Sequence, residues 1–452
     1  MNKVEFSIGS LESLVESVCS DNKPLHVVVV GTKPDLIKQA PILHELLKRG
    51  EKALLVHTGQ HYDENLSGGI EKEFGLQVDI NLKVALSDEP DETIKGGLSD
   101  VIARIINRWG KICGAIKQAN PNLKIIPYVH GDTTTCFATT TASFAHGFPV
   151  VHVEAGIRTL MIQRNLLDSI TKSSDSFQFR KWFDISANLS NYSGGSHEPF
   201  PEQWNTRASE AGTGIFMAPV SLAEENLLSE GFPSSRIFTV GNTVVDAMDF
   251  TNEIESDVFE RYPQLTDGFI RVCIHRRENT ENDERFMALF EMIEKLANDA
   301  EGDKPILWIL LPGTKAVLAR LQLEDRLQVL KENKKIVISD VWPKYSDVMA
   351  AMQRCILCAT DSGSMQEEMN MLGIPTATLR YGSDRPETFP AHSNVLCPPV
   401  SSELMVKVIQ GALDNLNIFE FPKLYGSNVS KKLVDHVVET MNEVGDLMRL
   451  KP

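Results

Sequence analysis

Small, hydroxyl-bearing and acidic residues gather between Asp361 and Glu368, directly after the apolar run Cys355–Cys358. The run predicts a strand buried in a parallel sheet, and the residues from Met365 onward predict a helix that stops before Gly373. The turn between them would present backbone N–H groups at a helix start, where the helix dipole attracts anions. Ligands of open α/β sheets bind at the carboxyl ends of the strands, so this stretch suggests a nucleotide diphosphate site.

Two acids follow this turn, and we interpret them differently. Glu367 completes the pattern Ser364-Met365-Gln366-Glu367, which is typical of a helix capping box. Glu368 has no role in that pattern. A carboxylate beside a phosphate-binding turn suits the two hydroxyl groups of a ribose, so Glu368 is the candidate for that contact.

Three further carboxylates stand in the first half of the chain. Asp132 ends a strand-like run, where it can either take part in chemistry or cap the helix that begins at the next threonines. Glu154 ends the core-like run Val150–Val153, and carboxylates are rarely buried without a partner. Glu202 precedes Arg207 and can be either a functional acid or an exposed helix start.

Basic residues follow two predicted strands of the second half. The motif His275-Arg276-Arg277-Glu278 comes directly after an apolar run. A charged run is usually just exposed to solvent. Because this run follows the carboxyl end of a predicted strand, a functional role is equally consistent with it. Arg385 follows the run Thr376–Leu379 and can face the same site.

The pattern of the chain supplies a scaffold that would bring these strand ends together. Apolar, β-branched runs alternate with stretches of helical periodicity in both halves. This alternation predicts an α/β protein with two Rossmann-like, doubly wound parallel-sheet domains that face each other across a cleft. The predicted strands are Leu25–Val30, Ala53–Val56, Ile125–Val129, Val150–Val153, Gly214–Pro219, Ile270–Ile274, Ile306–Leu311, Lys335–Ile338, Cys355–Cys358 and Thr376–Leu379.

The same pattern divides the chain into domains. We expect an N-terminal extension over 1–24, a first domain over 25–242, a second, nucleotide-binding domain over 243–427, and a C-terminal helix over 428–452 that packs back on the first domain. An insertion at about 161–198 interrupts the first domain. A long surface loop costs little in closure entropy, but the aromatic residues of the insertion favour a lid over the site or a subunit contact.

Composition excludes several classes of protein. The 452 residues are 42% hydrophobic and 23% charged, with a net charge of −16, which is typical of a globular protein and unsuited to nucleic acid or membrane surfaces. No apolar stretch is long enough to cross a membrane and no signal pattern opens the chain, so we expect a cytoplasmic protein. The cysteine pair Cys355/Cys358 lies in a predicted strand without a second pair, and we expect no metal site and no cofactor.

Several motifs, in the same order, resemble the non-hydrolysing UDP-N-acetylglucosamine 2-epimerases over about residues 25–400. The resemblance implies a fold like that of the B-type glycosyltransferases, with UDP against the second domain and the sugar facing the first. We also expect a homodimer. The motifs are Gly31-Thr32-Lys33-Pro34-Asp35-Leu36-Ile37-Lys38, Thr58-Gly59-Gln60-His61-Tyr62, Val129-His130-Gly131-Asp132-Thr133-Thr134, His152-Val153-Glu154-Ala155-Gly156-Ile157-Arg158-Thr159, Gly241-Asn242-Thr243, His275-Arg276-Arg277-Glu278-Asn279, Asp361-Ser362-Gly363, Gln366-Glu367-Glu368 and Arg385-Pro386-Glu387.

Carried over residue by residue, the resemblance implies a reaction and two sets of residues. UDP would be eliminated across C1–C2 to give a 2-acetamidoglycal, and it would add back after C2 is reprotonated from the other face. The catalytic or sugar-side residues would be Lys38, Asp132, Glu154, Glu202 and His275. The residues that bind UDP or the substrate would be Lys33, Arg207, Arg276, Ser362, Gly363, Ser364, Glu368 and Arg385.

The chain also departs from the family pattern. Lys33 stands where the family usually has arginine, and lysine lacks the planar fork that binds phosphate through two hydrogen bonds. Ser364 replaces a glycine of the phosphate turn, Gln203 replaces a second acid, and Thr206 replaces an arginine. The stretch 311–314 lacks a histidine that bacterial members use near their activating-substrate site, which argues against activation by substrate.

Three functions remain open from the sequence. The first is a 2-epimerase that interconverts UDP-N-acetylglucosamine, or a modified UDP-N-acetylhexosamine, with its C2 epimer. The second is a hydrolysing 2-epimerase or a glycosyltransferase of the same fold, and the motif that begins at His275 argues against the hydrolysing branch. The third is a non-catalytic UDP-sugar-binding protein, against which the retained acids argue.

Overall fold

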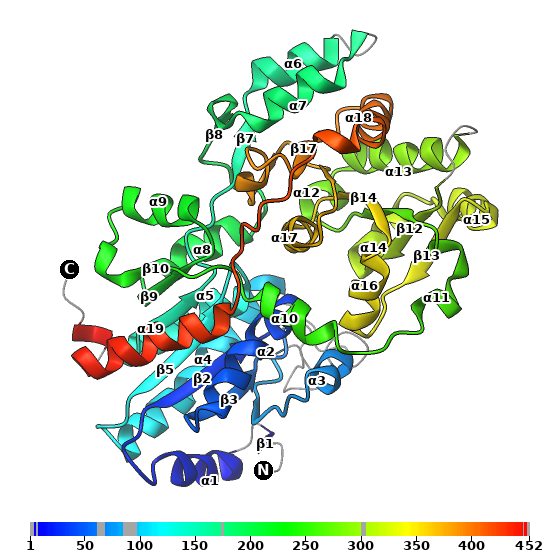
Figure 1. The fold of residues 1–452 in the computed structure, drawn as a ribbon. Helices are drawn as coiled ribbons and strands as arrows, with labels where there is room; N and C mark the ends of the chain where they lie inside the picture. The colour runs from blue at the N-terminus through cyan, green and yellow to red at the C-terminus, as the bar shows by residue number, and fades with distance from the viewer. Residues whose placement is uncertain are drawn as a thin grey trace.

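The computed structural model describes residues 4–5, 8–60, 68–84, 97–172, 176–299, 304–445 and 447–449. Two parallel sheets, one from each half of the chain, are each flanked by helices (Figure 1). This arrangement confirms the predicted fold class of two parallel-sheet α/β domains. The motif residues His61 and Tyr62 lie outside the described ranges.

The N-terminal sheet has the strand order β1-β4-β3-β2-β5-β6-β9-β10, and every pair in it is parallel. β2 and β5 are buried along their whole length, as strands covered on both faces should be. The polar residues after β5 and β6 therefore lie at neighbouring strand ends. The strands are β1 (Val4–Glu5), β2 (Leu25–Val30), β3 (Lys52–His57), β4 (Ile80–Asn81), β5 (Ile125–His130), β6 (Val150–Val153), β9 (Thr213–Ala218) and β10 (Ile237–Thr239).

The C-terminal sheet has the order β13-β12-β11-β14-β15-β17, again parallel throughout. β11 and β14 are direct neighbours, so the residues that follow them meet at one sheet edge. The two cysteines of β14 are buried free thiols. The strands are β11 (Phe269–Cys273), β12 (Ile306–Leu310), β13 (Ile336–Asp340), β14 (Cys355–Thr360), β15 (Thr376–Thr378) and β17 (Asn394–Leu396).

Helices connect the strands and cover the sheets, and α19 crosses back to lie against α2 in the first domain (Figure 1). None of the helices in the described ranges is both long and apolar enough to cross a membrane. The helices are α1 (Ile8–Val18), α2 (Lys33–Lys48), α3 (Gly69–Glu73), α4 (Gly97–Ala119), α5 (Thr134–Ala145), α6 (Arg164–Lys172), α7 (Phe179–Ala187), α8 (Glu202–Glu210), α9 (Ser221–Ser229), α10 (Val244–Thr251), α11 (Val258–Arg261), α12 (Arg277–Thr280), α13 (Asp283–Asn298), α14 (Pro312–Arg320), α15 (Glu324–Glu332), α16 (Tyr345–Met352), α17 (Gly363–Leu372), α18 (Ser402–Asp414) and α19 (Val429–Val444).

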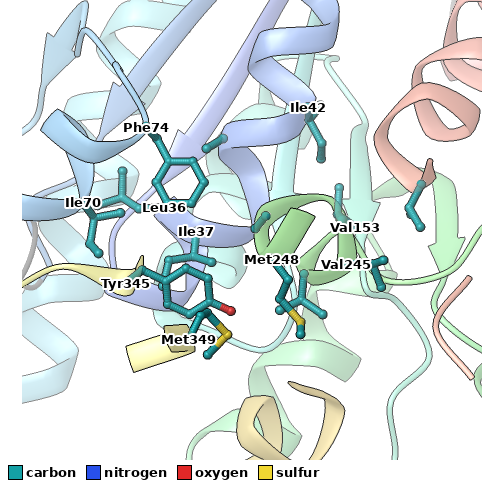
Figure 2. Packing of buried hydrophobic residues seen from close by; sticks show 14 of the residues in the cluster. Leu36, Ile37, Ile42, Ile70, Phe74, Val153, Val245, Met248, Tyr345 and Met349 are labelled. Atoms are coloured by element: carbon teal, nitrogen blue, oxygen red, sulfur yellow. The ribbon is translucent and has the colours of Figure 1, made fainter. Parts of the chain in front are cut away.

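One hydrophobic cluster contains side chains from both domains. Ile37 on α2 and Phe74 after α3 lie near Tyr345 and Met349 on α16 (Figure 2). The ring centroids of Phe74 and Tyr345 are 6.4 Å apart, and all four side chains are buried. Because burying a large apolar side chain is worth about 1.5–3 kcal/mol, this contact helps hold the domains together.

The insertion packs on the second domain, whereas the sequence pattern assigned it to the first. It begins with β7 (Leu160–Ile162), which pairs antiparallel with β16 (Gly382–Ser383) and with β8 (Tyr192–Ser193). Helix α7 lies on α18 and β17, and the indole N–H of Trp182 donates to the Leu396 carbonyl oxygen at 2.6 Å. The aromatic residues that suggested a lid or a subunit contact therefore have intramolecular partners. The sequence could not show this, because the Leu396 partner of Trp182 lies 214 positions away along the chain.

We expect Trp182→Ala to lower the free energy of unfolding by about 3–5 kcal/mol, because it removes a large buried side chain and leaves a cavity. Chemical denaturation measures this change. Lys181→Ala is the matched control, since Lys181 is exposed on the same helix and should change stability by no more than about 0.5 kcal/mol. Equal stabilities of the two variants would show that the insertion is not part of the second domain's core.

Candidate functional site

Helix α17 begins at the turn that the sequence singled out. Ser362 is its N-cap, and the Ser362 side chain accepts a hydrogen bond from the Met365 N–H at 3.5 Å. The predicted capping box of Ser364 and Glu367 is therefore wrong, because the helix starts two residues earlier than that pattern requires. The first turn carries no acidic residue, so its partial positive charge remains available to an anion.

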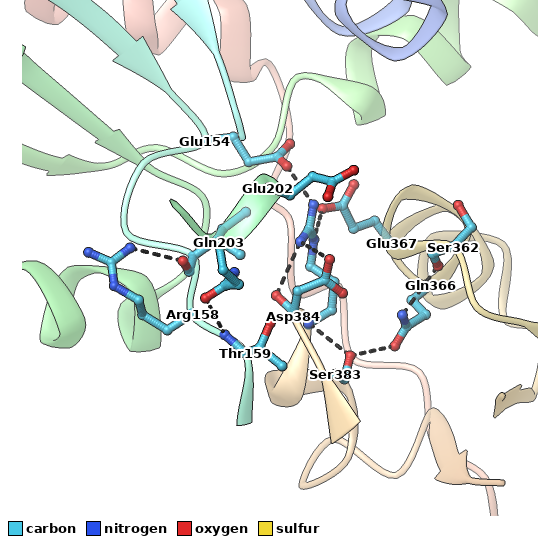
Figure 3. A network of polar contacts seen from close by, with 12 residues as sticks. Glu154, Arg158, Thr159, Glu202, Gln203, Ser362, Gln366, Glu367, Ser383 and Asp384 are labelled. Carbon is cyan, nitrogen blue, oxygen red and sulfur yellow. Dashed lines mark hydrogen bonds and ion pairs between the residues drawn. The ribbon is translucent and has the colours of Figure 1, made fainter. Parts of the chain in front are cut away.

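Space is tight at the first position of α17, Gly363. A Cβ added at Gly363 would lie 3.0 Å from Oδ2 of Asp384 and 3.3 Å from Nη2 of Arg276. The helix start is therefore closely bordered by one carboxylate and one guanidinium. Gln366 ties this turn to the loop before Arg385, since its amide donates to the Ser362 carbonyl oxygen and its Oε1 accepts from the Ser383 hydroxyl (Figure 3).

Glu154 follows β6 in a left-handed backbone conformation, with φ of 62°. This conformation is uncommon outside glycine and turns the carboxylate toward the other domain. Its Oε2 accepts from Lys38 Nζ at 2.5 Å, from Asn242 Nδ2 at 2.8 Å and from His130 Nε2 at 3.1 Å. Its Oε1 accepts from the Arg385 guanidinium at 2.6 Å.

Four buried charges join the domains here, and we call them the interdomain ion cluster: Lys38 and Glu154 from the first domain, Glu367 and Arg385 from the second. Lys38 Nζ also donates to Glu367 Oε2 at 2.6 Å, and Arg385 Nε donates to Glu367 Oε1. Burial alone would raise the pKa of Glu154, but the cations Lys38 and Arg385 hold it well below its usual value. Glu154 is therefore ionised.

Asp132 and Glu202 form a second pair of acids beside this cluster. Burial, and then the nearby Glu202 carboxylate, raise the pKa of Asp132 to about 6, against the opposing effect of Arg276. The guanidinium of Arg276 pairs with Glu202 Oε1 at 3.2 Å and with Asp384 Oδ2 at 3.3 Å. Asp132 does not cap α5, because that role falls to Thr133.

His275 follows β11, and its backbone N–H donates to the Asp361 carboxylate at 3.0 Å. The adjacent Arg276 N–H does the same at 3.0 Å. Asp361 thus fixes the loop that carries both residues. Burial lowers the pKa of His275, so its imidazole is neutral near pH 7.

Glu368 and Lys33 lie near α16 of the second domain. The Tyr345 hydroxyl donates to Glu368 Oε1 at 2.8 Å, and burial raises the pKa of Glu368 to about 7. Lys33 Nζ donates to the Trp342 carbonyl oxygen at 3.3 Å, so it reaches the second domain from α2. Burial lowers the pKa of Lys33, and Glu368 opposes that effect.

One of the predicted binding residues, Arg207, stands apart from these contacts, whereas Ser364 lies in the same helix turn as Gly363. The Arg207 side chain is 46% exposed and pairs with Glu230 at 3.9 Å, so the structure does not bring it to the carboxylates. Ser364 is the second residue of α17 and is half-buried. Except for Arg207, the predicted site residues gather where the strand ends of the two sheets meet.

Sequence reasoning missed several partners of these residues. The sequence pattern predicts a capping role for Glu367, whereas in the structure it pairs with Lys38 and Arg385. His130 and Asn242 lie in motifs that carried the family resemblance, yet no local pattern showed that both would hold Glu154. Asp384 precedes Arg385; burial alone would raise its pKa, but the cations Arg380, Arg385 and Arg276 hold it below the usual value.

The arrangement separates two kinds of carboxylate. Glu154 is held ionised by cations, whereas Asp132 can carry a proton near neutral pH. Guanidinium groups and a helix start lie beside them. Such a site can move a proton while it stabilises a departing anion. Among the described residues, no group of three or more His, Cys, Asp or Glu side chains could hold a metal ion.

The pKa of His130 gives a testable pH dependence. Burial alone would lower it, but contacts with Glu154 and Asp35 raise it to about 9. Because the folded state binds this proton more tightly than the unfolded state, the stabilisation is complete below about pH 6.5 and is lost as the pH rises through 9. In urea denaturation, His130→Asn should cost about 3 kcal/mol more at pH 6 than at pH 10.

His152→Asn is the control for this pH trend. Burial lowers the pKa of His152 to about 4, so the folded state binds that proton less tightly than the unfolded state. The cost of His152→Asn should therefore shrink, and not grow, toward low pH. A cost of His130→Asn that does not change with pH would mean that His130 is not protonated in the folded protein.

Comparisons with known proteins agree with this geometry. The family model described as UDP-N-acetylglucosamine 2-epimerase matches residues 44–174 and 191–438. The UDP-N-acetylglucosamine 2-epimerases of Methanocaldococcus jannaschii and Escherichia coli are each 28% identical to the chain, over 405 residues (87% of this chain, 94% of the relative) and 375 residues (81% and 84%). A crystal structure of the M. jannaschii protein in complex with UDP-GlcNAc and UDP has a TM-score of 0.72 at 26% identity, covering 92% of this chain and 99% of that one. The chain therefore belongs to the UDP-N-acetylglucosamine 2-epimerase family.

Proposed function

We propose that this protein is a non-hydrolysing epimerase that interconverts UDP-N-acetylglucosamine, or a modified UDP-N-acetylhexosamine, with its C2 epimer. The supporting observation is that acids of the first domain meet cations and a helix start of the second. Carboxylates suit proton transfer at carbon, while cations and a helix start suit a leaving diphosphate. The groups that meet are Asp132, Glu154, Glu202, Arg276, Arg385 and the start of α17.

The reaction proceeds by elimination and re-addition. A carboxylate takes the proton from C2, the C1–C2 double bond forms, and the C1–O bond breaks so that UDP leaves with the bonding electron pair. A second group then protonates C2 from the opposite face while UDP re-forms the bond to C1. No atom is gained or lost, and no cofactor is needed. Water must stay out, because its addition at C1 would release the free sugar.

Asp132 and Glu202 are the candidates for the two proton-transfer groups. The pKa of Asp132, about 6, lets it both take and give a proton near neutral pH. Glu202 Oε2 is buried and has no hydrogen-bond partner among the described residues, so it is available to a substrate. Glu154 is ionised and fixed by its cations, which suits it to orient the sugar. The neutral imidazole of His275 can share a hydrogen bond with the departing oxygen.

The diphosphate would bind at the start of α17, between Ser362, Gly363 and Arg276. The Arg276 guanidinium already borders Gly363, and Lys33 can reach from the first domain. Glu368 would receive the ribose hydroxyls in place of its present contact with the Tyr345 hydroxyl. A homodimer stays a prediction of the sequence, which light scattering can test.

We expect the protein to convert UDP-N-acetylglucosamine to its C2 epimer and, in D2O, to place deuterium at C2 of the recovered UDP-sugar. Proton NMR measures both. Asp132→Asn should lower turnover by about 10²–10⁴-fold, because it removes a proton-transfer group, while UDP affinity stays the same. Free N-acetylmannosamine as the sole product would assign the protein to the hydrolysing class. Inertness toward several UDP-N-acetylhexosamines would favour a binding protein.

Calorimetry can test the contact of Lys33 with the nucleotide. Lys33→Ala should weaken UDP binding by about 1.5–3 kcal/mol, the value of a hydrogen bond to a charged group. Lys33→Arg should keep or improve the affinity, because arginine adds the planar fork. Lys48→Ala serves as the control, since Lys48 lies at the far end of α2 with an 80% exposed side chain. Equal affinities in all variants would remove Lys33 from the site.

A further inference from the structure

The loop that carries Glu154 is fastened to helix α8 at two points. The Gly156 N–H donates to Glu210 Oε1 at 3.0 Å, and the Thr159 N–H donates to Gln203 Oε1 at 3.1 Å. Arg158, between them, donates from Nη1 to the same Glu210 Oε1 at 3.0 Å and pairs with Glu210 Oε2 through Nη2. Figure 3 shows Gln203, Thr159 and Arg158 on this side of the site.

This loop needs external support because its backbone is unfavourable. Glu154 and Gly156 both have positive φ, 62° and 84°. A non-glycine residue in that region costs on the order of 1–3 kcal/mol, which the surroundings must offset. At Gly156 the fit is also tight, since an added Cβ would lie 2.2 Å from the Ala223 carbonyl oxygen. The contacts to α8 are among those that hold the loop in this shape.

Glu210 is a buried acid, and its contacts lie on this loop. Its side chain is 0% exposed, and the groups that hydrogen-bond to it are the Gly156 N–H and the Arg158 guanidinium. A carboxylate buried at this depth is costly unless it is paired. Arg158 has a second partner, Glu230, whose side chain is 34% exposed and which contacts this loop through the Arg158 guanidinium.

We propose that Glu210 is a positioning residue that sets the Glu154 carboxylate relative to Glu202. Glu202 is the first residue of α8 and Glu210 is the last. The positions of Glu202 and of the loop that carries Glu154 are therefore both set by this helix. A long insertion separates Glu154 from Glu202 along the chain. The two hydrogen bonds to α8 nevertheless join the loop of Glu154 directly to the helix that begins at Glu202. The proposal rests on the proposed epimerase function, because it concerns the geometry of that site.

Glu210→Ala should lower kcat for epimerisation by about 10²-fold, the effect of a displacement of about 1 Å in a catalytic group. UDP affinity should stay the same, because UDP would bind the other domain. Glu210→Gln keeps an oxygen that can accept from the Gly156 N–H and should lower kcat by only about 10-fold. If Glu210→Ala does not fold, the glutamine variant decides, and a folded Glu210→Gln with wild-type kcat would overturn the proposal.

Two comparisons separate positioning from a general loss of structure. Glu230→Ala also removes a partner of Arg158 but leaves Gly156 held, so its kcat should equal that of the wild type. In a Glu154→Gln background, Glu210→Ala should cause no further loss, because the group that it positions is already disabled. Equal losses for Glu210→Ala and Glu230→Ala, or a full further loss in that background, would contradict the proposal.

The outcomes also distinguish this proposal from the proposed function. If the wild-type protein does not epimerise UDP-N-acetylhexosamines, the proposed function fails and the positioning role fails with it. If the wild-type protein is active and Glu210→Ala, shown to be folded by circular dichroism, keeps the wild-type kcat, only the positioning role fails.

Discussion

The four buried charges of the interdomain ion cluster constrain the rest of this structure. Lys38, Glu154, Glu367 and Arg385 are each no more than 4% exposed. An unpaired charge at this depth would cost several kcal/mol, so each of the four depends on the others. Two come from each domain, so any motion that separates the domains must break the Lys38–Glu367 and Glu154–Arg385 ion pairs. Any change in the relative placement of the domains would therefore also change the electrostatics of the site.

The backbone also connects the two sides of this cluster through strand β7 and its partner β16. The loop that carries Glu154 runs directly into β7, and β7 pairs with β16, which ends just before Asp384 and Arg385. Leu160 lies opposite Ser383 in that pairing, so the segments that bear the two halves of the Glu154–Arg385 ion pair are in register. The rest of the insertion is anchored by its own buried aromatic residues, which join the second domain's core. The insertion is therefore not a surface decoration, because its first strand holds two site loops together.

Much of the fold and part of the candidate site could be predicted from the sequence, for a physical reason. Strands buried on both faces are apolar throughout, and parallel topology brings their carboxyl ends to one edge, so Asp132, Glu154 and His275 were recognisable by position. The role of Glu367 could not be recognised in this way. The same local sequence fits both a helix cap and an ion pair with Lys38, which is distant in the sequence. The contact of the insertion with the second domain could not be predicted either, because its partners are distant in the sequence and leave no local pattern. Arg207 shows a third limit: a shift of one position on a helix turns a side chain by about 100°, away from the site.

Charge balance also suggests how a diphosphate would act in this site. Arg385 is already bound by Glu154 and Glu367 at short distances, whereas Arg276 makes longer contacts with Glu202 and Asp384, at 3.2 and 3.3 Å. An incoming diphosphate would therefore compete most easily for Arg276. Glu202 would then lose the guanidinium that pairs with its Oε1. Arg276 would in this way free a carboxylate of the candidate site when the diphosphate binds, while Arg385 stays paired with Glu154 and Glu367 and keeps the domains in place.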